Sequence, residues 1–195
     1  MGVTFDNKEH RFVFDFEHDG MDDIVSLTGD GYQVEAFGRR FYYGYEFSEQ
    51  VDGNVRSAFI KHVKFTDDLQ NNPDLTTFIK KAIDQLNRRI NLYDYNLVVM
   101  PESSSRVNQY MLRYIYRFAQ PMLRKMELVK SLPTIEKDEK LCTTIRKQNI
   151  LVMDDVTTSG STLNEVLRTL RILNDDNEIT IFSLIGRKDL MAETM

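Results

Sequence analysis

The spacing of hydrophobic and polar positions changes near residue 70 of this 195-residue chain. Before that point, apolar and polar residues alternate, most clearly in 11–16 and 40–47, and glycine-containing turn dipeptides separate the alternating runs. Alternation with a period of two and an enrichment in aromatic residues are typical of strands with one buried face. The pattern predicts a small antiparallel meander of three to five strands between about Thr4 and Phe65.

After residue 70, apolar residues at helical spacing alternate with short, wholly apolar runs. Asn72, Pro73 and Asp74 have the order of a helix cap, a first helical position and an acidic first turn. Strands that alternate with helices predict a parallel sheet with right-handed crossovers. The elements expected from this pattern are strands at 97–100, 127–132, 150–153 and 179–185, and helices at 73–90, 107–118 and 163–173.

The same change of pattern divides the chain into two parts. We expect residues 1–70 to form a β-rich N-terminal subdomain and residues 71–195 to form an α/β core. A chain of this length is one domain, or one domain with an elaboration, and can bury a substantial core.

Composition narrows the classes of protein and partner. Apolar residues make up 42% of the chain and charged residues 28%, as in ordinary soluble proteins. The net charge of −5 argues against a general nucleic-acid binder. The single cysteine, Cys142, permits no intramolecular disulfide, and no apolar run has the length of a membrane span. We therefore expect a cytoplasmic protein with no membrane partner.

The segment 149–162, NILVMDDVTTSGST, carries the most information about function. An apolar strand leads into Asp154 and Asp155, then into a loop of hydroxyls and glycine, and then into a helix. Ligands of open α/β sheets bind at the carboxyl ends of the strands. Gly160 allows backbone N–H groups to converge on an anion, which the positive end of the following helix also favours. An ordinary acidic turn of a doubly wound sheet is the alternative.

This segment resembles the phosphoribosyl pyrophosphate (PRPP) signature of the type I phosphoribosyltransferases. The resemblance implies that Asp154 and Asp155 are the catalytic residues, which hold the ribose hydroxyls and serve as ligands of Mg²⁺. Ser161 stands where the family commonly has a second glycine. The loop that would bind the 5′-phosphate of PRPP comprises Thr157, Thr158, Ser159, Gly160, Ser161 and Thr162.

In this family, a loop after the first core strand holds the pyrophosphate. Residues Glu102, Ser103, Ser104, Ser105 and Arg106 occupy that place here. Serine hydroxyls and an arginine fork suit phosphate oxygens, although serines at a helix start are also ordinary caps. Arg106 and the residues after it also resemble the helix start of the ComF-like branch. An acid at Glu102 departs from a simple pyrophosphate site.

A mobile loop over the reacting centre is the third element that the resemblance implies. Residues 133–148 lie where the family keeps this loop. Lys137 and Lys140 are the candidates for a cation that reaches the departing pyrophosphate. Charged loops are also commonly just solvated.

The expected fold is therefore α/β, with a parallel-sheet type I phosphoribosyltransferase core and an N-terminal antiparallel β-rich hood. The expected function is phosphoribosyl transfer from PRPP, with Mg²⁺, to a nucleobase or related amine, a small-molecule acceptor that remains open; a homodimer is a possible assembly. One alternative is a non-catalytic PRPP- or nucleotide-binding regulator or ComF-like accessory protein. Another is a different phosphate-binding α/β domain, such as a nucleotide hydrolase.

Overall fold

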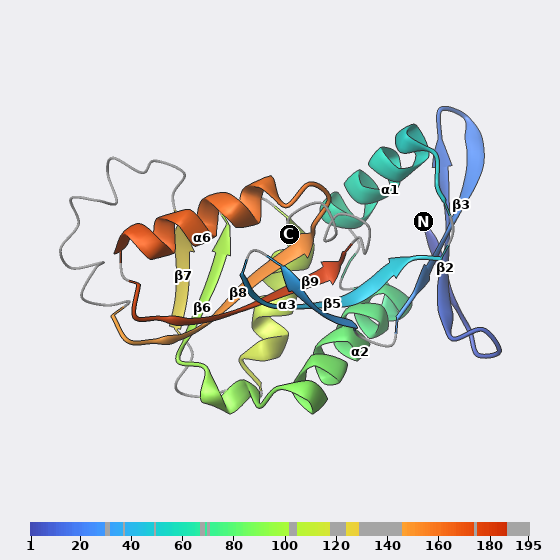
Figure 1. Ribbon diagram of the computed structural model, residues 1–195. Helices are drawn as coiled ribbons and strands as arrows, with labels where there is room; N and C mark the ends of the chain where they lie inside the picture. The colour runs from blue at the N-terminus through green and yellow to red at the C-terminus, as the bar shows by residue number, and fades with distance from the viewer. Residues whose placement is uncertain are drawn as a thin grey trace.

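A computed structural model describes residues 1–29, 32–36, 38–48, 50–66, 69, 71–101, 105–117, 124–128, 146–173 and 175–186. Figure 1 shows the arrangement of its elements. The strands are β1 (Gly2–Asp6), β2 (Arg11–His18), β3 (Met21–Thr28), β4 (Tyr32–Ala36), β5 (Arg39–Phe47), β6 (Leu97–Pro101), β7 (Arg124–Leu128), β8 (Asn149–Val156) and β9 (Glu178–Ile185). The helices are α1 (Gly53–Phe65), α2 (Pro73–Arg89), the short 3₁₀ helix η1 (Leu92–Asp94), α3 (Arg106–Ile115) and α6 (Ser161–Leu173).

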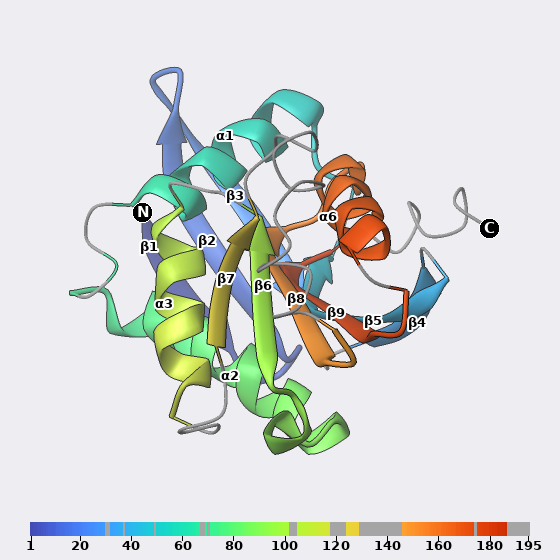
Figure 2. The same ribbon diagram turned by 90° about the vertical axis from the view of Figure 1, so that its left-hand side faces the viewer.

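One mixed sheet contains all nine strands of the described residues, in the order β1-β2-β3-β5-β9-β8-β6-β7, with β4 paired to β5. The strands from β5 to β7 along this order are parallel to one another, and the remaining pairs are antiparallel. Figure 2 shows the parallel strands side by side in this order. The α/β fold class with a parallel core is thus confirmed.

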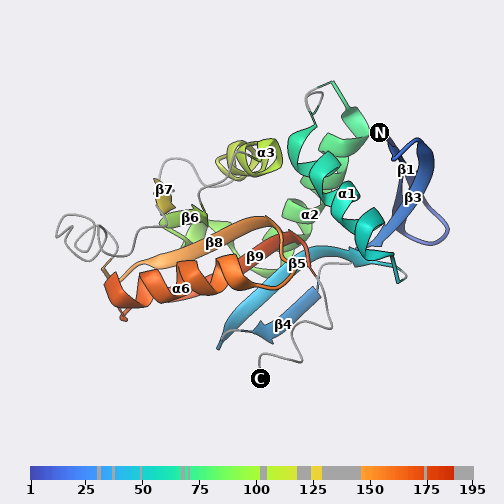
Figure 3. The ribbon, with the colours of Figure 1, turned by 90° about the horizontal axis from the view of Figure 1, so that it is seen from above.

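Helices cover both faces of the parallel strands, as Figure 3 shows from above. Helix α6 lies on one face, where its leucines pack against Ile150 and Val152 of β8. Helices α1, α2 and α3 lie on the other face, in a cluster with Leu151 and Met153 of the same strand. Both faces of β8 are therefore buried, which explains why its sequence is a continuous apolar run rather than an alternating one.

Helix α2 begins where the sequence places it. The Asn72 side chain accepts a hydrogen bond from the backbone N–H of Leu75, and Pro73 occupies the first position. Arg88 and Arg89 in the last turn interact favourably with the negative end of the helix dipole. Its apolar residues recur at helical spacing and are buried, so local pattern and packing agree.

The hairpin between β2 and β3 also follows from its turn residues. His18 pairs with Met21, and the two residues between them, Asp19 and Gly20, have φ values of 53° and 75°. Positive φ at both central positions defines the turn that matches the twist of two antiparallel strands. Glycine and aspartate tolerate that conformation, which is why the Asp-Gly dipeptide predicted a turn.

The segment predicted to lie wholly in the meander ends in a helix, so that part of the prediction is wrong. Asp52 accepts a hydrogen bond from the backbone N–H of Asn54 and caps α1. Phe59 and Val63, one turn apart, are fully buried. The Asp-Gly dipeptide at residues 52 and 53 is therefore a helix start rather than a hairpin turn, because both structures favour the same residues.

A single sheet crosses the predicted boundary at residue 70. Strand β5 pairs in parallel with β9, from Arg40 opposite Thr180 to Tyr45 opposite Ile185. Strand β7 lies three residues earlier than the predicted strand at 127–132 and ends at Leu128. The N-terminal strands thus extend the sheet that carries the 149–162 segment.

Candidate functional site

The two aspartates of the 149–162 segment lie inside the end of β8 rather than after it, because the strand continues to Val156. Side chains alternate between the faces of a strand. Asp154 therefore shares the α6 face with Val152, and Asp155 shares the opposite face with Met153. The two carboxylates nevertheless lie close enough to interact, because the charge of Asp155 raises the pKa of Asp154.

Asp155 is fully buried and is paired with a lysine that the sequence did not suggest. The Lys64 ammonium, in the last turn of α1, lies 2.8 Å from Oδ1 of Asp155. The backbone N–H of Val156 donates to the same oxygen at 2.7 Å. The other oxygen, Oδ2, is buried and has no hydrogen-bond partner in the described part of the chain.

Asp154 is also buried, with 6% of its surface exposed. Its Oδ1 accepts the backbone N–H of Asp155 at 2.9 Å. Burial, and then the neighbouring charge of Asp155, raise the pKa of Asp154 to about 7, while Lys64 acts in the opposite direction. A buried carboxyl with a raised pKa at a sheet edge is a physical marker of functional sites.

The predicted phosphate loop follows directly and turns into α6. Thr157 is buried, and its N–H donates to the carbonyl of Ile185 at 2.9 Å, which fixes the start of the loop to β9. Its hydroxyl has no hydrogen-bond partner among the described residues. Gly160 has φ of 70°, a conformation that glycine adopts without strain.

The far end of this loop forms the start of α6. The hydroxyls of Ser159 and Ser161 lie 3.0 Å apart, and the N–H of Asn164 donates to the carbonyl of Gly160 at 2.8 Å. Thr158, Ser159 and Ser161 are exposed, whereas Thr162 is half-buried inside the helix. The first N–H groups of a helix lack partners within the helix, so this end can bind an anion.

The predicted pyrophosphate loop begins at the same edge of the sheet. Strands β6 and β8 pair in parallel from Leu97 opposite Ile150, which brings Pro101, the end of β6, to the level of Asp154. Ser105 is buried and caps α3 by accepting the N–H of Asn108 at 3.4 Å. Arg106 is exposed in the first turn of that helix.

Several predicted site residues lie outside the described residues. These are Glu102, Ser103 and Ser104 of the pyrophosphate loop and Lys137 and Lys140 of the lid. Among the described residues, Lys64 forms an ion pair with the signature residue Asp155.

Sequence reasoning missed Lys64 and did not single out the burial of Asn108. The apolar spacing of Val55, Phe59 and Val63 was the signal that could have placed Lys64 on a helix. Asn108 is 3% exposed, and neither polar atom of its amide has a hydrogen-bond partner among the residues described. Such a buried amide beside the β6–α3 loop is a further candidate contact for a polar ligand.

The residues present fit Mg²⁺ only together with a ligand. No group of three or more His, Cys, Asp or Glu side chains gathers anywhere in the described ranges. Mg²⁺ is commonly held by one or two carboxylates together with substrate phosphates. Oδ2 of Asp155 is an orphaned carboxylate oxygen of the kind this ion prefers, and Asp154 is the second carboxylate at this edge.

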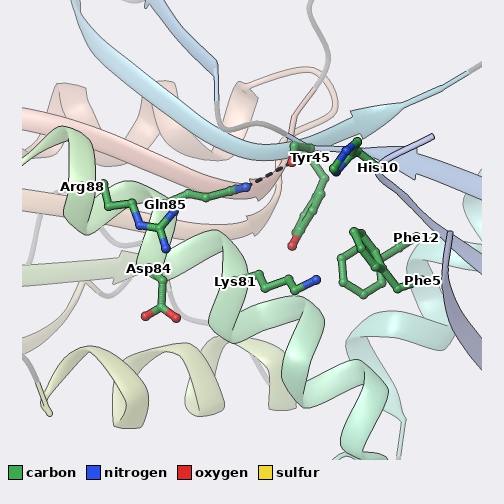
Figure 4. A pocket seen from close by; sticks show the side chains of 9 residues that line it. Phe5, His10, Phe12, Tyr45, Lys81, Asp84, Gln85 and Arg88 are labelled. Carbon is green, nitrogen blue, oxygen red and sulfur yellow. Dashed lines mark hydrogen bonds between the residues drawn. The ribbon is translucent and has the colours of Figure 1, made fainter. Parts of the chain in front are cut away.

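Two cavities lie away from the signature. One, of about 230 Å³, lies between α2 and the N-terminal strands; in Figure 4, Lys81 points toward Phe5. The Lys81 ammonium lies 3.5 Å from the centre of the Phe5 ring, and Gln85 donates to the carbonyl of Gly29 at 3.1 Å. These groups already contact the protein itself, so we interpret this cavity as part of the packing between α2 and the strands.

The second cavity, of about 380 Å³, lies at the opposite edge of the parallel strands. Asn149 and Glu178, the first residues of β8 and β9, line it. Because ligands of open α/β sheets bind at the carboxyl edge, the signature remains the candidate functional site.

Among the described residues, no helix is both long and apolar enough to cross a membrane. The sequence matches no protein-family model and no curated protein.

Three solved structures similar to this chain are phosphoribosyltransferases. A hypoxanthine-guanine-xanthine phosphoribosyltransferase is 18% identical, with a TM-score of 0.39 over 58% of this chain and 62% of that chain. A phosphoribosyltransferase from Corynebacterium diphtheriae is 14% identical, with a TM-score of 0.39 over 69% of this chain and 94% of that chain.

A third similar structure is HGPRT-ase from Leishmania tarentolae in complex with GMP. It is 12% identical, with a TM-score of 0.32 over 58% of this chain and 65% of that chain. This chain thus spans less than two thirds of the first and third structures. Likenesses this distant carry no argument about function, which rests on the site itself.

Proposed function

We propose that this chain binds PRPP at the carboxyl edge of β8 and transfers its phosphoribosyl group to a nucleobase or related amine, releasing pyrophosphate. Asp154 and Asp155 hold the ribose hydroxyls, and the loop from Thr157 to Thr162 binds the 5′-phosphate. The acceptor enters as a small molecule, with Mg²⁺ bound alongside PRPP.

One observation carries this proposal: two buried carboxylates lead directly into a hydroxyl-rich loop and a helix N-terminus at one sheet edge. Asp154 and Asp155 lie at the end of β8, and α6 begins at Ser161. Burying carboxylates costs stability, so an ordinary turn gives no reason to keep both there. Two buried acceptors, Oδ2 of Asp155 and Oγ1 of Thr157, also lack partners among the described residues.

The chemistry that these residues perform is positioning and electrostatic stabilisation. Displacement at the anomeric carbon breaks the bond to pyrophosphate and forms a bond to the acceptor nitrogen, with positive charge developing on the ribose ring. Asp154 and Asp155 orient the ring through its hydroxyls, and their negative charge favours that state. Asp154, Asp155 and phosphate oxygens would hold Mg²⁺, which would neutralise charge on the leaving pyrophosphate.

Glu102 favours a second candidate function. An acid in the loop expected to hold pyrophosphate repels that group, which weakens support for the leaving group. A regulator that binds PRPP or a nucleotide, or a ComF-like accessory protein, needs the phosphate and ribose contacts but no turnover. A phosphate-binding α/β domain of another class would need neither PRPP nor an acceptor.

Release of pyrophosphate from PRPP separates these functions. The assay measures pyrophosphate with Mg²⁺ and each of a panel of purine bases, pyrimidine bases and orotate. The proposal predicts release that depends on one acceptor and is lost in Asp154→Asn/Asp155→Asn. PRPP binding without release for any acceptor would favour the regulator, and failure to bind PRPP would overturn both.

A further inference from the structure

We infer that Lys64 is a positioning residue of the phosphoribosyl site: its ammonium fixes the Asp155 carboxylate so that Oδ2 faces the ligand. This inference deepens the proposed function and rests on it. It brings α1, from the N-terminal part of the chain, into a site otherwise built from β8 and α6.

The hydrogen bonds of Asp155 are divided unequally between its two oxygens. Lys64 Nζ lies 2.8 Å from Oδ1, and the N–H of Val156 donates to Oδ1 at 2.7 Å. Oδ2 has no partner within the described ranges although it is buried. Two donors on one oxygen fix the torsion of the carboxylate, so the second oxygen is held as a directed acceptor.

The position of Lys64 is fixed by the packing of its helix and by the ion pair that it forms with Asp155. Helix α1 is anchored by Phe59, whose ring contacts those of Phe14 and Phe16 at 5.0 and 5.8 Å between centroids. The Lys64 side chain is 27% exposed, and its ammonium contacts a carboxylate with no exposure at all. A flexible surface lysine would give a weak, screened pair, whereas this pair has a buried acceptor.

The location of the pair links it to ligand binding rather than to stability alone. Asp155 belongs to the signature that we propose holds ribose, and replacing a buried ion pair by apolar groups often leaves stability unchanged or increases it. A purely structural contact could therefore be apolar. A directed carboxylate oxygen cannot be replaced in that way, because a ribose hydroxyl needs an acceptor.

Calorimetric titration of PRPP with Mg²⁺ into three variants tests this inference. Lys64→Met should weaken PRPP binding at least about tenfold, and Lys64→Arg should restore most of it, since a charged donor remains. Lys61→Met, which removes an exposed lysine from the same helix, is the matched control and should bind like wild type. Wild-type affinity in a folded Lys64→Met would overturn the inference.

A double-variant comparison covers the case in which Lys64→Met does not fold. In Asp155→Asn, Lys64 has lost the carboxylate with which it forms its ion pair, so adding Lys64→Met should leave the residual PRPP affinity unchanged. A further loss of at least about fivefold would show that Lys64 acts independently of Asp155 and would contradict its role. If wild type itself fails to bind PRPP, the proposed function is contradicted. If PRPP binds equally well with and without the Lys64 ammonium, only this inference is contradicted.

Discussion

Asp154 and Asp155 have different partners although they are neighbours in the chain. Lys64 and the backbone N–H of Val156 contact the Asp155 carboxylate, whereas the backbone N–H of Asp155 donates to Asp154. The alternation of side chains along a strand could have predicted the two faces. Lys64 could not be paired with Asp155 from the sequence, because the contact depends on how α1 packs against β8.

Replacing Asp154 should stabilise the ligand-free protein at neutral and alkaline pH. Its pKa is raised from 3.8 to about 7, so the folded state binds more protons than the unfolded state between these values. The free energy of unfolding contributed by this group therefore falls as pH rises through that window. Asp154→Asn should gain on the order of 1–4 kcal/mol over wild type at pH 8.

Thermal unfolding of both proteins at pH 4 and pH 8 measures this effect. The difference between Asp154→Asn and wild type should be small at pH 4 and larger at pH 8. An equal difference at both pH values would show that burial does not raise the pKa of Asp154.

At the scale of elements, a helix or strand could be predicted where the residues that mark it lie within its own segment of the sequence. Asn72 and Pro73 mark the start of α2, and the apolar run of β8 marks a strand buried on both faces. Helix α1 has apolar residues at helical spacing, Val55, Phe59 and Val63, but its cap at Asp52 shares residue types with turns. Its helical state is favoured by the packing of Phe59 and Val63, which a local pattern does not contain.

Truncation of Phe59 should detach α1 from the strands. Phe59 is fully buried and contacts Phe14, Phe16 and Phe47, so Phe59→Ala should cost about 3–5 kcal/mol of unfolding free energy. Phe65, in the same helix, is 53% exposed, and Phe65→Ala should change stability by less than about 0.5 kcal/mol.

Urea unfolding of the two variants gives both values. Equal and small losses would mean that α1 does not depend on this aromatic cluster. The same comparison tests whether this cluster holds Lys64 in place, because α1 positions Lys64 beside Asp155.

At the scale of the whole molecule, the N-terminal strands and the parallel core share one sheet and one hydrophobic cluster. Phe12 and Phe14 of β2 belong to the same cluster as Leu151 of β8 and Phe182 of β9. The sequence indicated both kinds of sheet through their periods, but not that β5 joins them through β9. Such strand pairings between distant segments leave no periodic signal in either strand.

This continuity predicts a single cooperative unfolding transition. An independent N-terminal subdomain over 1–70 would unfold separately from 71–195, whereas a shared core couples them. Scanning calorimetry should give a van't Hoff enthalpy equal to the calorimetric enthalpy. Two resolved transitions would instead support two independently stable parts.

The central claim is that the buried carboxylates of β8 and the loop after them bind PRPP. Calorimetric titration of PRPP with Mg²⁺ into wild type and into Asp154→Asn/Asp155→Asn tests it most directly, with circular dichroism to confirm that both are folded. We predict saturable binding by wild type and its loss in the variant. A folded wild type that does not bind PRPP, or a variant that binds equally well, would contradict the assignment of this site.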